Sequence, residues 1–302
     1  MVRGEYMEDA IIVYNPMSGD GQAPKYVDLL KEKLETNEIH TEEYKSKNQE
    51  DMVSAAQMAC EKAFTYLFVL GGDGSVNDIL NGMLGESYKP ILGIIPLGTG
   101  NIISGNLGFK GSPDSIIDSL NLEDRDFIDI GLAGNKAFGY MFSIGEIPKM
   151  IQETDRDEKK WLGQLAYAKE ILSSGLEFST YHLLVESNSG RIEGDFSHVI
   201  VSNSTHFKDL QFAQGANKPN DGLFNVYLFK AMTNGEMLSL AVDAARGQIQ
   251  ENENVIFFAT EALSILTKSE EVPTDMDGDK GPSLPLEFKV LPKFVEVLVV
   301  KE

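Results

Sequence analysis

Short apolar runs alternate with amphipathic stretches along the first third of the chain. The apolar runs predict strands at Ala10–Tyr14, Tyr66–Leu70 and Ile91–Ile95, with a weaker strand at Ile39–Tyr44, and helical spacing is found at Pro24–Leu34, Glu50–Phe64 and Val76–Leu84. Apolar strands that alternate with helices form parallel sheets covered by helices on both faces. The pattern therefore predicts an α/β domain with a doubly wound parallel sheet.

The pattern changes after about Asp129, where strand-like segments follow one another with few helices between them. These segments are Tyr140–Ile144, Glu177–Glu186, His198–Ser202, Phe224–Phe229, Val255–Thr260, Leu263–Leu266, Leu286–Val290 and Phe294–Val299, with helical spacing mainly at Lys160–Leu172 and Asn234–Ala245. This order indicates a mainly antiparallel, β-rich domain. We expect an α/β domain over residues 1–128 and a β-rich domain over residues 129–302, and the sequence leaves open whether the last strands return to the first domain.

Three loops rich in small residues follow predicted strands of the first domain. They are Asn15–Gly19, Gly71–Asn77 and Leu97–Asn101. Ligands of parallel sheets bind beyond the carboxyl ends of the strands, so the loops should share one mouth. Glycines let backbone N–H groups approach a phosphate, and a helix that begins there adds its positive dipole end. Asp73 alone would repel phosphate, so its carboxylate indicates Mg²⁺ bridged to a nucleotide.

Composition limits the class of partner. The chain has 302 residues and a formal net charge of −21, which argues against nucleic acid and against tight binding to anionic membrane surfaces. The single cysteine, Cys60, excludes an internal disulfide. Because no apolar run approaches the length of a membrane span and Met1–Ala10 lacks a signal-peptide core, we expect a cytoplasmic protein.

The three loops together resemble the catalytic domain of diacylglycerol kinases in its bacterial lipid kinase form, a family that includes sphingosine and ceramide kinases. The resemblance rests on Asn15-Pro16-Met17-Ser18-Gly19, on Gly71-Gly72-Asp73-Gly74-Ser75-Val76-Asn77 and on Pro96-Leu97-Gly98-Thr99-Gly100-Asn101. It continues at Asp221-Gly222-Leu223 and at Asp277-Gly278-Asp279, and thus spans essentially the whole chain.

This resemblance implies a two-domain kinase that binds ATP in the first domain and a lipid in the second. It assigns ATP binding to Asn15, Pro16, Ser18, Gly19, Ser46, Gly71, Gly72, Asp73, Gly74, Ser75, Asn77, Gly98, Thr99, Gly100 and Asn101. It places Asp73 toward the catalytic Mg²⁺, and a structural metal at Asp221 with the carbonyl groups of Lys218 and Leu223. Asp279 takes the position of the general base that accepts the proton of the lipid hydroxyl.

The chain departs from the family pattern at the general base, where Asp-Gly-Asp replaces Asp-Gly-Glu. The carboxylate chemistry is kept, but a base must come within about 2.6–3.2 Å of the proton that it takes. Ser75 replaces the usual threonine, and Ile102–Gly105 replaces a polar segment. A calcium loop at Asp275–Asp279 is excluded because Lys280 occupies the glycine position.

The sequence thus predicts phosphoryl transfer from Mg·ATP to a lipid hydroxyl, with diacylglycerol as the preferred acceptor and phosphatidic acid as the product. The net acidity favours a neutral acceptor, with transient, peripheral contact of apolar residues at the inner face of the membrane. Two alternatives remain: a lipid- and nucleotide-binding protein that has lost catalysis through its shortened carboxylate, and an NAD kinase, which shares the Gly-Gly-Asp-Gly turn. The oligomeric state stays open, with a homodimer as one option.

Overall fold

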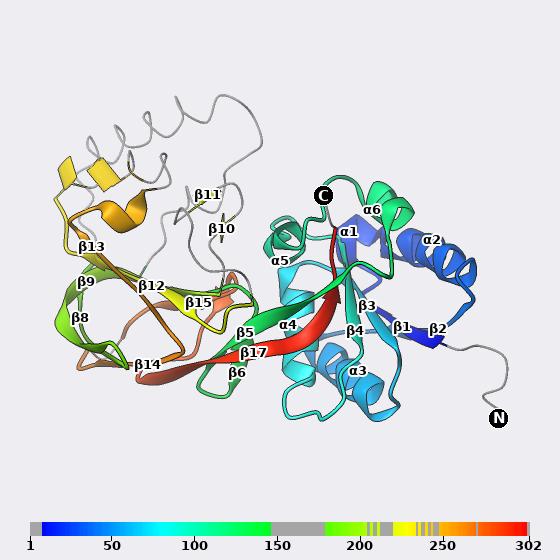
Figure 1. Ribbon diagram of the computed structural model, residues 1–302, viewed down its shortest axis with the longest axis horizontal. Coiled ribbons are helices and arrows are strands. Elements are labelled where there is room, and N and C mark those ends of the chain that lie inside the picture. Colours follow the sequence, from blue (N-terminus) through cyan, green and yellow to red (C-terminus); the bar gives the residue numbers. More distant parts are fainter. Residues whose placement is uncertain are drawn as a thin grey trace. The chain divides into compact units, whose positions relative to one another are not determined.

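The computed structural model describes residues 8–145, 179–203, 206–207, 210–211, 220–233, 235–236, 239–240, 243, 248–269 and 271–300. The chain divides into two compact units (Figure 1). Unit 1 comprises residues 1–130, 136–139 and 291–302, and unit 2 comprises residues 131–135 and 140–290. No helix in the described part of the chain is long and apolar enough to span a membrane.

Unit 1 is built on a parallel sheet with strand order β2-β1-β3-β4-β17, in which β17 is Leu286–Leu298. Its elements are β1 Glu8–Tyr14, α1 Ser18–Gly21, α2 Ala23–Glu35, β2 Ile39–Lys45, α3 Gln49–Glu61, β3 Tyr66–Gly71, α4 Asp73–Gly82, β4 Ile91–Pro96, α5 Ile102–Asn106, α6 Pro113–Ser119 and β6 Lys136–Phe138. Figure 1 shows α2 and α6 on one face of this sheet and α3 on the other. The predicted doubly wound sheet is confirmed.

The apolar runs of β1, β3 and β4 are buried along almost their whole length. Ile12, Phe68 and Ile95 each have no exposed side-chain surface, as expected of strands covered on both faces. The close approach of α3 and α4 depends on Gly82, because a Cβ at that position would collide with the Val53 carbonyl oxygen. Helix α4 begins earlier than the apolar spacing predicted, since Gly72 serves as an extended N-cap and Asp73 enters the first turn.

The described strand pairs among β7 to β16, and that of β14 with β17, are antiparallel in unit 2. Its elements are β7 Met141–Ile144, β8 Tyr181–Ser187, β9 Gly190–Ser202, β10 His206–Phe207, β11 Leu210–Gln211, β12 Phe224–Lys230, the 3-10 helix η1 Ile249–Glu251, β13 Val255–Thr260, β14 Ala262–Thr267, β15 Thr274–Met276 and β16 Asp279–Lys280. The predicted β-rich class is confirmed. The helix predicted at Lys160–Leu172 lies outside the described residues, as does much of the one at Asn234–Ala245.

Two long strands belong partly to each unit, β5 Arg125–Ala133 and β17 Leu286–Leu298. The prediction of separate strands at Leu286–Val290 and Phe294–Val299 is wrong, because β17 runs through both. Pro292 cannot donate to a ladder, and Lys293 after it adopts a φ of 48°. The Lys293 N–H instead donates to the Asp129 carboxylate at 2.7 Å, so a side chain replaces the missing strand partner.

Candidate active site

The first predicted phosphate loop follows β1 and is folded by its own polar groups. Asn15 Oδ1 accepts the Met17 N–H at 2.9 Å, and the Asn15 carbonyl accepts the Ser18 N–H at the same distance. Gly19 has a φ of 61°, in the left-handed region that glycine adopts at little cost. These features turn the chain sharply at the carboxyl end of β1, and they leave Met17 77% exposed.

The second and third loops meet through their glycines. A Cβ on Gly98 would lie 2.6 Å from the Gly72 Cα, and the Leu97 N–H donates to the Gly71 carbonyl at 2.9 Å. The first loop joins them, since a Cβ on Gly19 would lie 3.4 Å from the Leu97 Cβ. The structure therefore brings together the three loops that the sequence singled out, at the carboxyl edge of the unit 1 sheet.

Asn101 holds the third loop in shape. Its Oδ1 accepts the Gly98 N–H at 2.9 Å, and its Nδ2 donates to the Gly98 carbonyl at 2.6 Å. Its φ of 51° is left-handed, a conformation that asparagine tolerates better than most residues. Thr99 lies inside the loop that Asn101 closes, and it is exposed. Thr99 is thus exposed in a turn that the two Asn101–Gly98 hydrogen bonds hold in shape.

Asp73 lies in the first turn of α4 and bridges to α5. Its Oδ1 accepts the Ile103 N–H at 3.0 Å, and its Oδ2 faces Gly100, where a Cβ would lie 2.8 Å away. Burial raises the pKa of the Asp73 carboxyl, while the backbone hydrogen bonds oppose that shift. The side chain therefore caps α5 through one oxygen and turns the other toward the third loop.

Helix α4 presents an N-terminus suited to an anion. Its N-cap is Gly72, which has no side chain with which to cap the first turn. The first N–H groups of a helix have no partner inside the helix, and together with the dipole they attract phosphate. Ser75, in the same turn, packs its side chain against Gly71, which explains why position 71 has no room for a Cβ.

Two predicted nucleotide contacts, Ser46 and Asn77, are buried within the protein. The Ser46 side chain is 2% exposed, and its hydroxyl donates to the Tyr14 carbonyl at 3.3 Å. Asn77 is 8% exposed, and its backbone carbonyl accepts a hydrogen bond from the Asn81 side-chain amide at 2.9 Å. In this structure Ser46 joins β2 to the end of β1, just before Asn15, and Asn77 contacts the next turn of its helix.

Asn81 holds strand β6 in place through Ala137, and the sequence pattern did not predict this role. Its Oδ1 accepts the Ala137 N–H at 2.9 Å, and its Nδ2 donates to the Ala137 carbonyl at 3.0 Å. The amide thus replaces a strand partner for β6 and ties it to α4. Its place four residues after Asn77, on the same helix face, was the available signal, but its partner lies 56 residues away.

In unit 2 the predicted general base lies on the hairpin of β15 and β16. Asp277 and Gly278 form the turn with φ of 54° and 91°, and Met276 pairs with Asp279 across it. Asp279 is exposed on β16. A two-residue turn with both φ values positive matches the twist of a hairpin, which explains the Asp-Gly pair in this motif.

The two other carboxylates of this hairpin are bound to backbone. Asp277 is 5% exposed, and its Oδ1 accepts the N–H groups of Tyr140 and Met141 at 3.0 and 2.9 Å. Asp275 Oδ1 accepts the Gly278 N–H at 3.0 Å. Burial, and to a smaller degree the Asp279 charge, raise the pKa of Asp275. Asp277 therefore anchors the turn to β7, and Asp275 closes it.

The predicted structural metal site falls on a turn at the start of β12. Asp221 Oδ1 accepts the Leu223 N–H at 3.0 Å, and Gly222 has a φ of 78°. Lys218, the third predicted contributor, lies outside the described residues. Within the described ranges, no group of three or more His, Cys, Asp or Glu side chains is placed to hold a metal. A kinase magnesium needs fewer, because it binds through one or two carboxylates together with phosphate oxygens and waters.

The chain matches two family models. Residues 9–133 match the diacylglycerol kinase catalytic domain, and residues 149–299 match the YegS C-terminal NAD kinase beta sandwich-like domain. A Streptococcus pneumoniae serotype 4 protein named "Putative lipid kinase" is 34% identical over 291 residues, which cover 96% of this chain and 98% of that protein. The chain belongs to the diacylglycerol kinase family.

A further relative and a solved structure are also similar to this chain. The diacylglycerol kinase of Bacillus subtilis strain 168 is 25% identical over 301 residues, covering 98% of each chain. A crystal structure described as "a putative diacylglycerol kinase from Bacillus anthracis" has the same fold, with a TM-score of 0.76 at 21% identity over 99% of this chain and 97% of that one. The protein is a lipid kinase, and its family implies a nucleotide and a lipid as substrates, with ATP as donor and typically a divalent metal.

Proposed function

We propose that this lipid kinase transfers the γ-phosphoryl group of Mg·ATP to the primary hydroxyl of diacylglycerol and releases phosphatidic acid. Unit 1 would bind the nucleotide and unit 2 the lipid. The observation that carries the proposal is the meeting of the loops of Asn15–Gly19, Gly71–Asn77 and Pro96–Asn101 at the open N-terminus of α4. Phosphoryl transfer is mostly positioning and charge neutralisation, which such a backbone surface supplies.

The donor set of unit 1 fits Mg²⁺ bound together with ATP. Asp73 has one oxygen engaged by the Ile103 N–H and the other turned toward Gly100. One carboxylate oxygen is what a magnesium shared with phosphates requires of the protein. When bound, the ion would neutralise charge on the phosphates. The backbone of the glycine-rich loops would surround the same phosphates and position them. Asp221, Leu223 and Lys218 stay a prediction for a second, structural metal.

Asp279 is proposed as the base that accepts the proton of the lipid hydroxyl. Its carboxylate is exposed, and the turn that carries it is fixed by Asp277 and Asp275. Its side chain is shorter by one methylene than the glutamate of the family pattern. Because a misplacement of about 1 Å can cost about 10²-fold in rate, the fixed turn must supply the reach that the side chain lacks.

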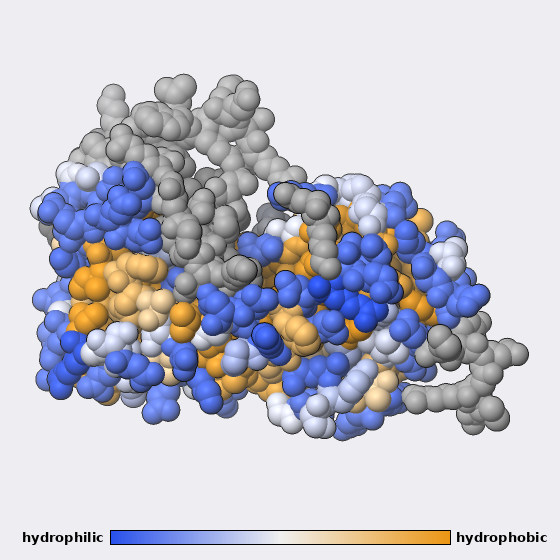
Figure 2. All heavy atoms as spheres, in the orientation of Figure 1, coloured by the Kyte–Doolittle hydropathy of each residue, from blue (hydrophilic) through white to orange (hydrophobic). Residues whose placement is uncertain are grey.

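Contact with the membrane is proposed to be peripheral and apolar. Figure 2 shows hydrophobic residues gathered over the part of unit 2 that holds β12 and β13. Four successive residues of β13, Ile256–Ala259, are only partly buried. A chain with a net charge of −21 gains little from anionic lipid head groups, so apolar side chains are the better membrane contact.

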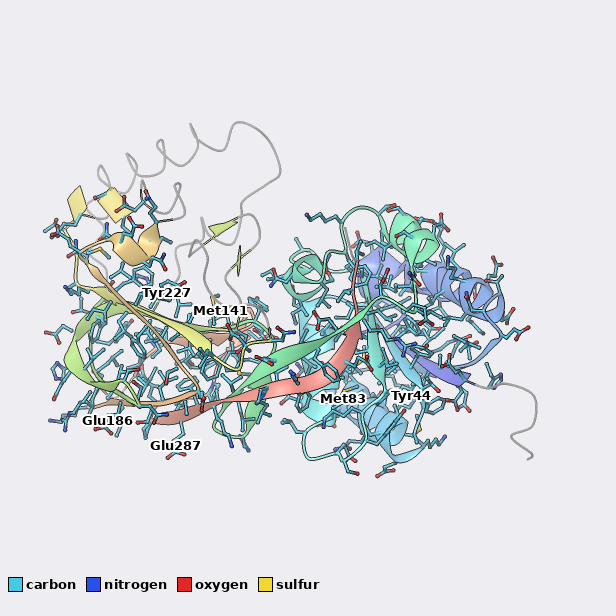
Figure 3. All side chains as sticks on the ribbon, in the orientation of Figure 1. Tyr44, Met83, Met141, Glu186, Tyr227 and Glu287 are labelled. Atoms are coloured by element: carbon cyan, nitrogen blue, oxygen red, sulfur yellow. The ribbon has the colours of Figure 1, made fainter. Side chains whose placement is uncertain are left out.

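The test is transfer of labelled γ-phosphate from Mg·ATP to diacylglycerol, sphingosine, ceramide, phosphatidylglycerol or polyprenol in mixed micelles, with NAD and no acceptor as controls. We expect labelled phosphatidic acid, and a loss of about 10²–10⁴-fold in Asp279→Ala. Glu287→Gln removes another exposed carboxylate of unit 2, on β17 (Figure 3), and should leave the rate unchanged.

The remaining outcomes separate the alternatives. ATP binding without lipid labelling, with labelling restored in Asp279→Glu, would identify a binding protein that lost catalysis through its shortened carboxylate. Labelled NAD would contradict the lipid acceptor. Preferential labelling of another lipid in the panel would keep the kinase and replace diacylglycerol.

A further inference from the structure

One face of the sheet of β7, β9 and β12 in unit 2 is apolar where the three strands pair, at Phe142, Ile144, Val199, Val201, Val226 and Leu228. Residues paired across these strands share a face, and one such row is Phe142, Val201 and Val226. Each of the three has no exposed surface, and Phe142 packs edge-to-face on Phe288 of β17 at 4.9 Å between ring centroids. We call this side the core face.

The opposite side of the same sheet carries polar side chains that are just as deeply buried. Ser143 pairs with Ile200, which pairs with Tyr227, and the next row on this face joins Met141, Ser202 and Asn225. These two rows contain four polar residues, Ser143, Ser202, Asn225 and Tyr227, and none is more than 5% exposed. We refer to the four together as the polar row. Figure 3 labels Met141 of β7 and Tyr227 of β12 in the upper part of unit 2 as drawn, and Glu186 of β8 and Glu287 of β17 in its lower part.

Ser143 and Asn225 of the polar row each have a buried atom that lacks a hydrogen bond within the described part of the chain. These atoms are the hydroxyl oxygen of Ser143, which is fully buried, and the Oδ1 of Asn225, which is 1% exposed. Ser202 differs, because its hydroxyl donates to the Tyr140 carbonyl at 2.9 Å. An unpaired buried polar group costs stability, and the core face shows that this sheet packs well without any. A ligand that pairs with Ser143 and Asn225 would offset that cost.

The neighbours of these two side chains define the chemistry of the ligand. Met141, Ile200 and Phe257 share the face and are apolar. No Lys or Arg lies on this face of β7, of β9 from Val199 to Ser202, of β12 from Asn225 to Phe229, or of β13. His198, which pairs with Phe229, is the titratable residue of the following row on this face. Two hydrogen-bonding groups beside the apolar side chains of Met141, Ile200 and Phe257 match uncharged oxygen atoms embedded in hydrocarbon.

We propose that Ser143 and Asn225 recognise the ester groups that join the acyl chains to the glycerol of a neutral diacyl lipid. This inference rests on the proposed function and names the part of the acceptor that the site reads. The Ser143 hydroxyl donates to one ester carbonyl. The Asn225 amide has no partner that fixes its orientation, so it can turn its NH₂ end toward the other carbonyl. The acyl chains lie along Met141, Ile200 and Phe257.

The test compares a diester with the diether that lacks both carbonyls. Dihexanoylglycerol and dihexylglycerol are each titrated for the rise in Tm that they cause, and each is assayed as phosphoryl acceptor. We expect wild type to prefer the diester in both measurements. In Ser143→Ala and in Asn225→Leu the ratio of diester to diether affinity should fall about tenfold, the usual scale of one lost hydrogen bond with an unpaired group left behind.

Ser202→Ala is the matched control, because its hydroxyl is already bound to the Tyr140 carbonyl on the same face. It should keep the wild-type ratio. Without lipid, Ser143→Ala should have a Tm equal to or above that of wild type, since it removes an unpaired polar atom. A merely structural or water-binding hydroxyl would instead lower the Tm and affect both lipids equally.

The outcomes distinguish this inference from the proposed function. Equal binding of diester and diether in wild type, or an unchanged ratio in both variants, would overturn the inference even if both lipids are phosphorylated. Selective diester binding lost in the variants, but without phosphoryl transfer, would support the ester site and contradict the proposed reaction.

Discussion

Two regions of the molecule are organised in opposite ways. One is the edge of unit 1 where the loops Asn15–Gly19, Gly71–Asn77 and Pro96–Asn101 meet, which we call the loop edge, and the other is the Asp-Gly-Asp hairpin of unit 2. The loop edge depends on missing side chains, since Gly72 and Gly98 approach so closely that a Cβ on either would collide with or crowd the other. The hairpin depends on side chains with separate tasks, because Asp277 and Asp275 bind backbone N–H groups and Asp279 is exposed.

Because of this difference, substitutions should change stability and activity together at the loop edge but separately in the hairpin. At the loop edge, any added atom changes the surface that would meet the phosphates, so stability and activity should fall together. In the hairpin, the carboxylate proposed for chemistry is not one of those that hold the turn. Substitution there should therefore affect activity alone at Asp279, and both properties at Asp277.

The largest expected loss of stability follows from Asp277→Ala. It would leave the buried N–H groups of Tyr140 and Met141 without an acceptor, at a cost of about 2–5 kcal/mol of unfolding free energy. A shifted turn should also lower kcat by about 10²-fold. Urea unfolding and labelled-phosphate transfer would measure both.

Asp277→Asn is the control for that variant. It keeps an acceptor oxygen and tolerates the φ of 54°, so it should recover most of the stability. Equal loss in the alanine and asparagine variants would mean that the two backbone hydrogen bonds do not anchor the hairpin.

The next largest effect is expected for Gly98→Ala in unit 1. The new Cβ would lie 2.6 Å from the Gly72 Cα and 2.9 Å from Asn101 Oδ1, and neither atom can move freely. We expect a loss of about 1–3 kcal/mol in unfolding free energy, the usual range for overpacking, with a parallel fall in ATP affinity.

Gly105→Ala gives the matched comparison in the neighbouring helix α5. No atom lies within 4 Å of its added Cβ, so the variant should be neutral or gain up to about 1 kcal/mol. Similar losses at positions 98 and 105 would show that the close approach of the two loops is not what matters.

The sequence predicted the loop edge far better than the hairpin, and the reason is physical. Glycines after apolar strands have few uses, and parallel topology brings strand ends together, so Gly71–Asn77 and Pro96–Asn101 could be located without a structure. The roles of Asp277 and Asn81 depend on backbone groups 136 and 56 residues away, and no local pattern encodes such a partner.

Local patterns also mislead where a distant group compensates for them. The sequence pattern predicted two separate strands at Leu286–Val290 and Phe294–Val299, but the Asp129 carboxylate accepts the Lys293 N–H and the strand continues. The unpaired atoms of Ser143 and Asn225 were equally invisible, because each lies in an ordinary strand pattern and only the paired strands show that the two share a face.

A smaller effect, opposite in sign, is expected for Asp275→Asn. Burial raises the pKa of this carboxyl, so its ionised form is disfavoured in the folded protein and destabilises it at neutral pH. Asparagine keeps an acceptor for the Gly278 N–H and removes the charge. The variant should therefore have a higher Tm than wild type at pH 7. That gain should shrink as the pH falls through the raised pKa toward 3.8, the ordinary value for aspartate. A gain that grows on acidification would contradict this account.

The smallest effect concerns carboxylates that only make surface pairs, and it gives the reference for the hairpin. His182 lies between Asp195 at 2.9 Å and Glu193 at 3.5 Å, and its hydrogen bond to Asp195, then that to Glu193, raises the pKa of the imidazole. The charged imidazole is favoured in the folded state, so its contribution is complete below the ordinary pKa of 6.5 and is lost as the pH rises through the raised value. His182→Gln should lower the Tm slightly at acidic pH, have no effect at alkaline pH, and leave phosphoryl transfer unchanged. If activity fell in His182→Gln as much as is expected for Asp277→Ala, then disturbing surface carboxylates such as Asp195 would also impair the reaction. The hairpin would then not differ from the rest of unit 2 in its importance for activity.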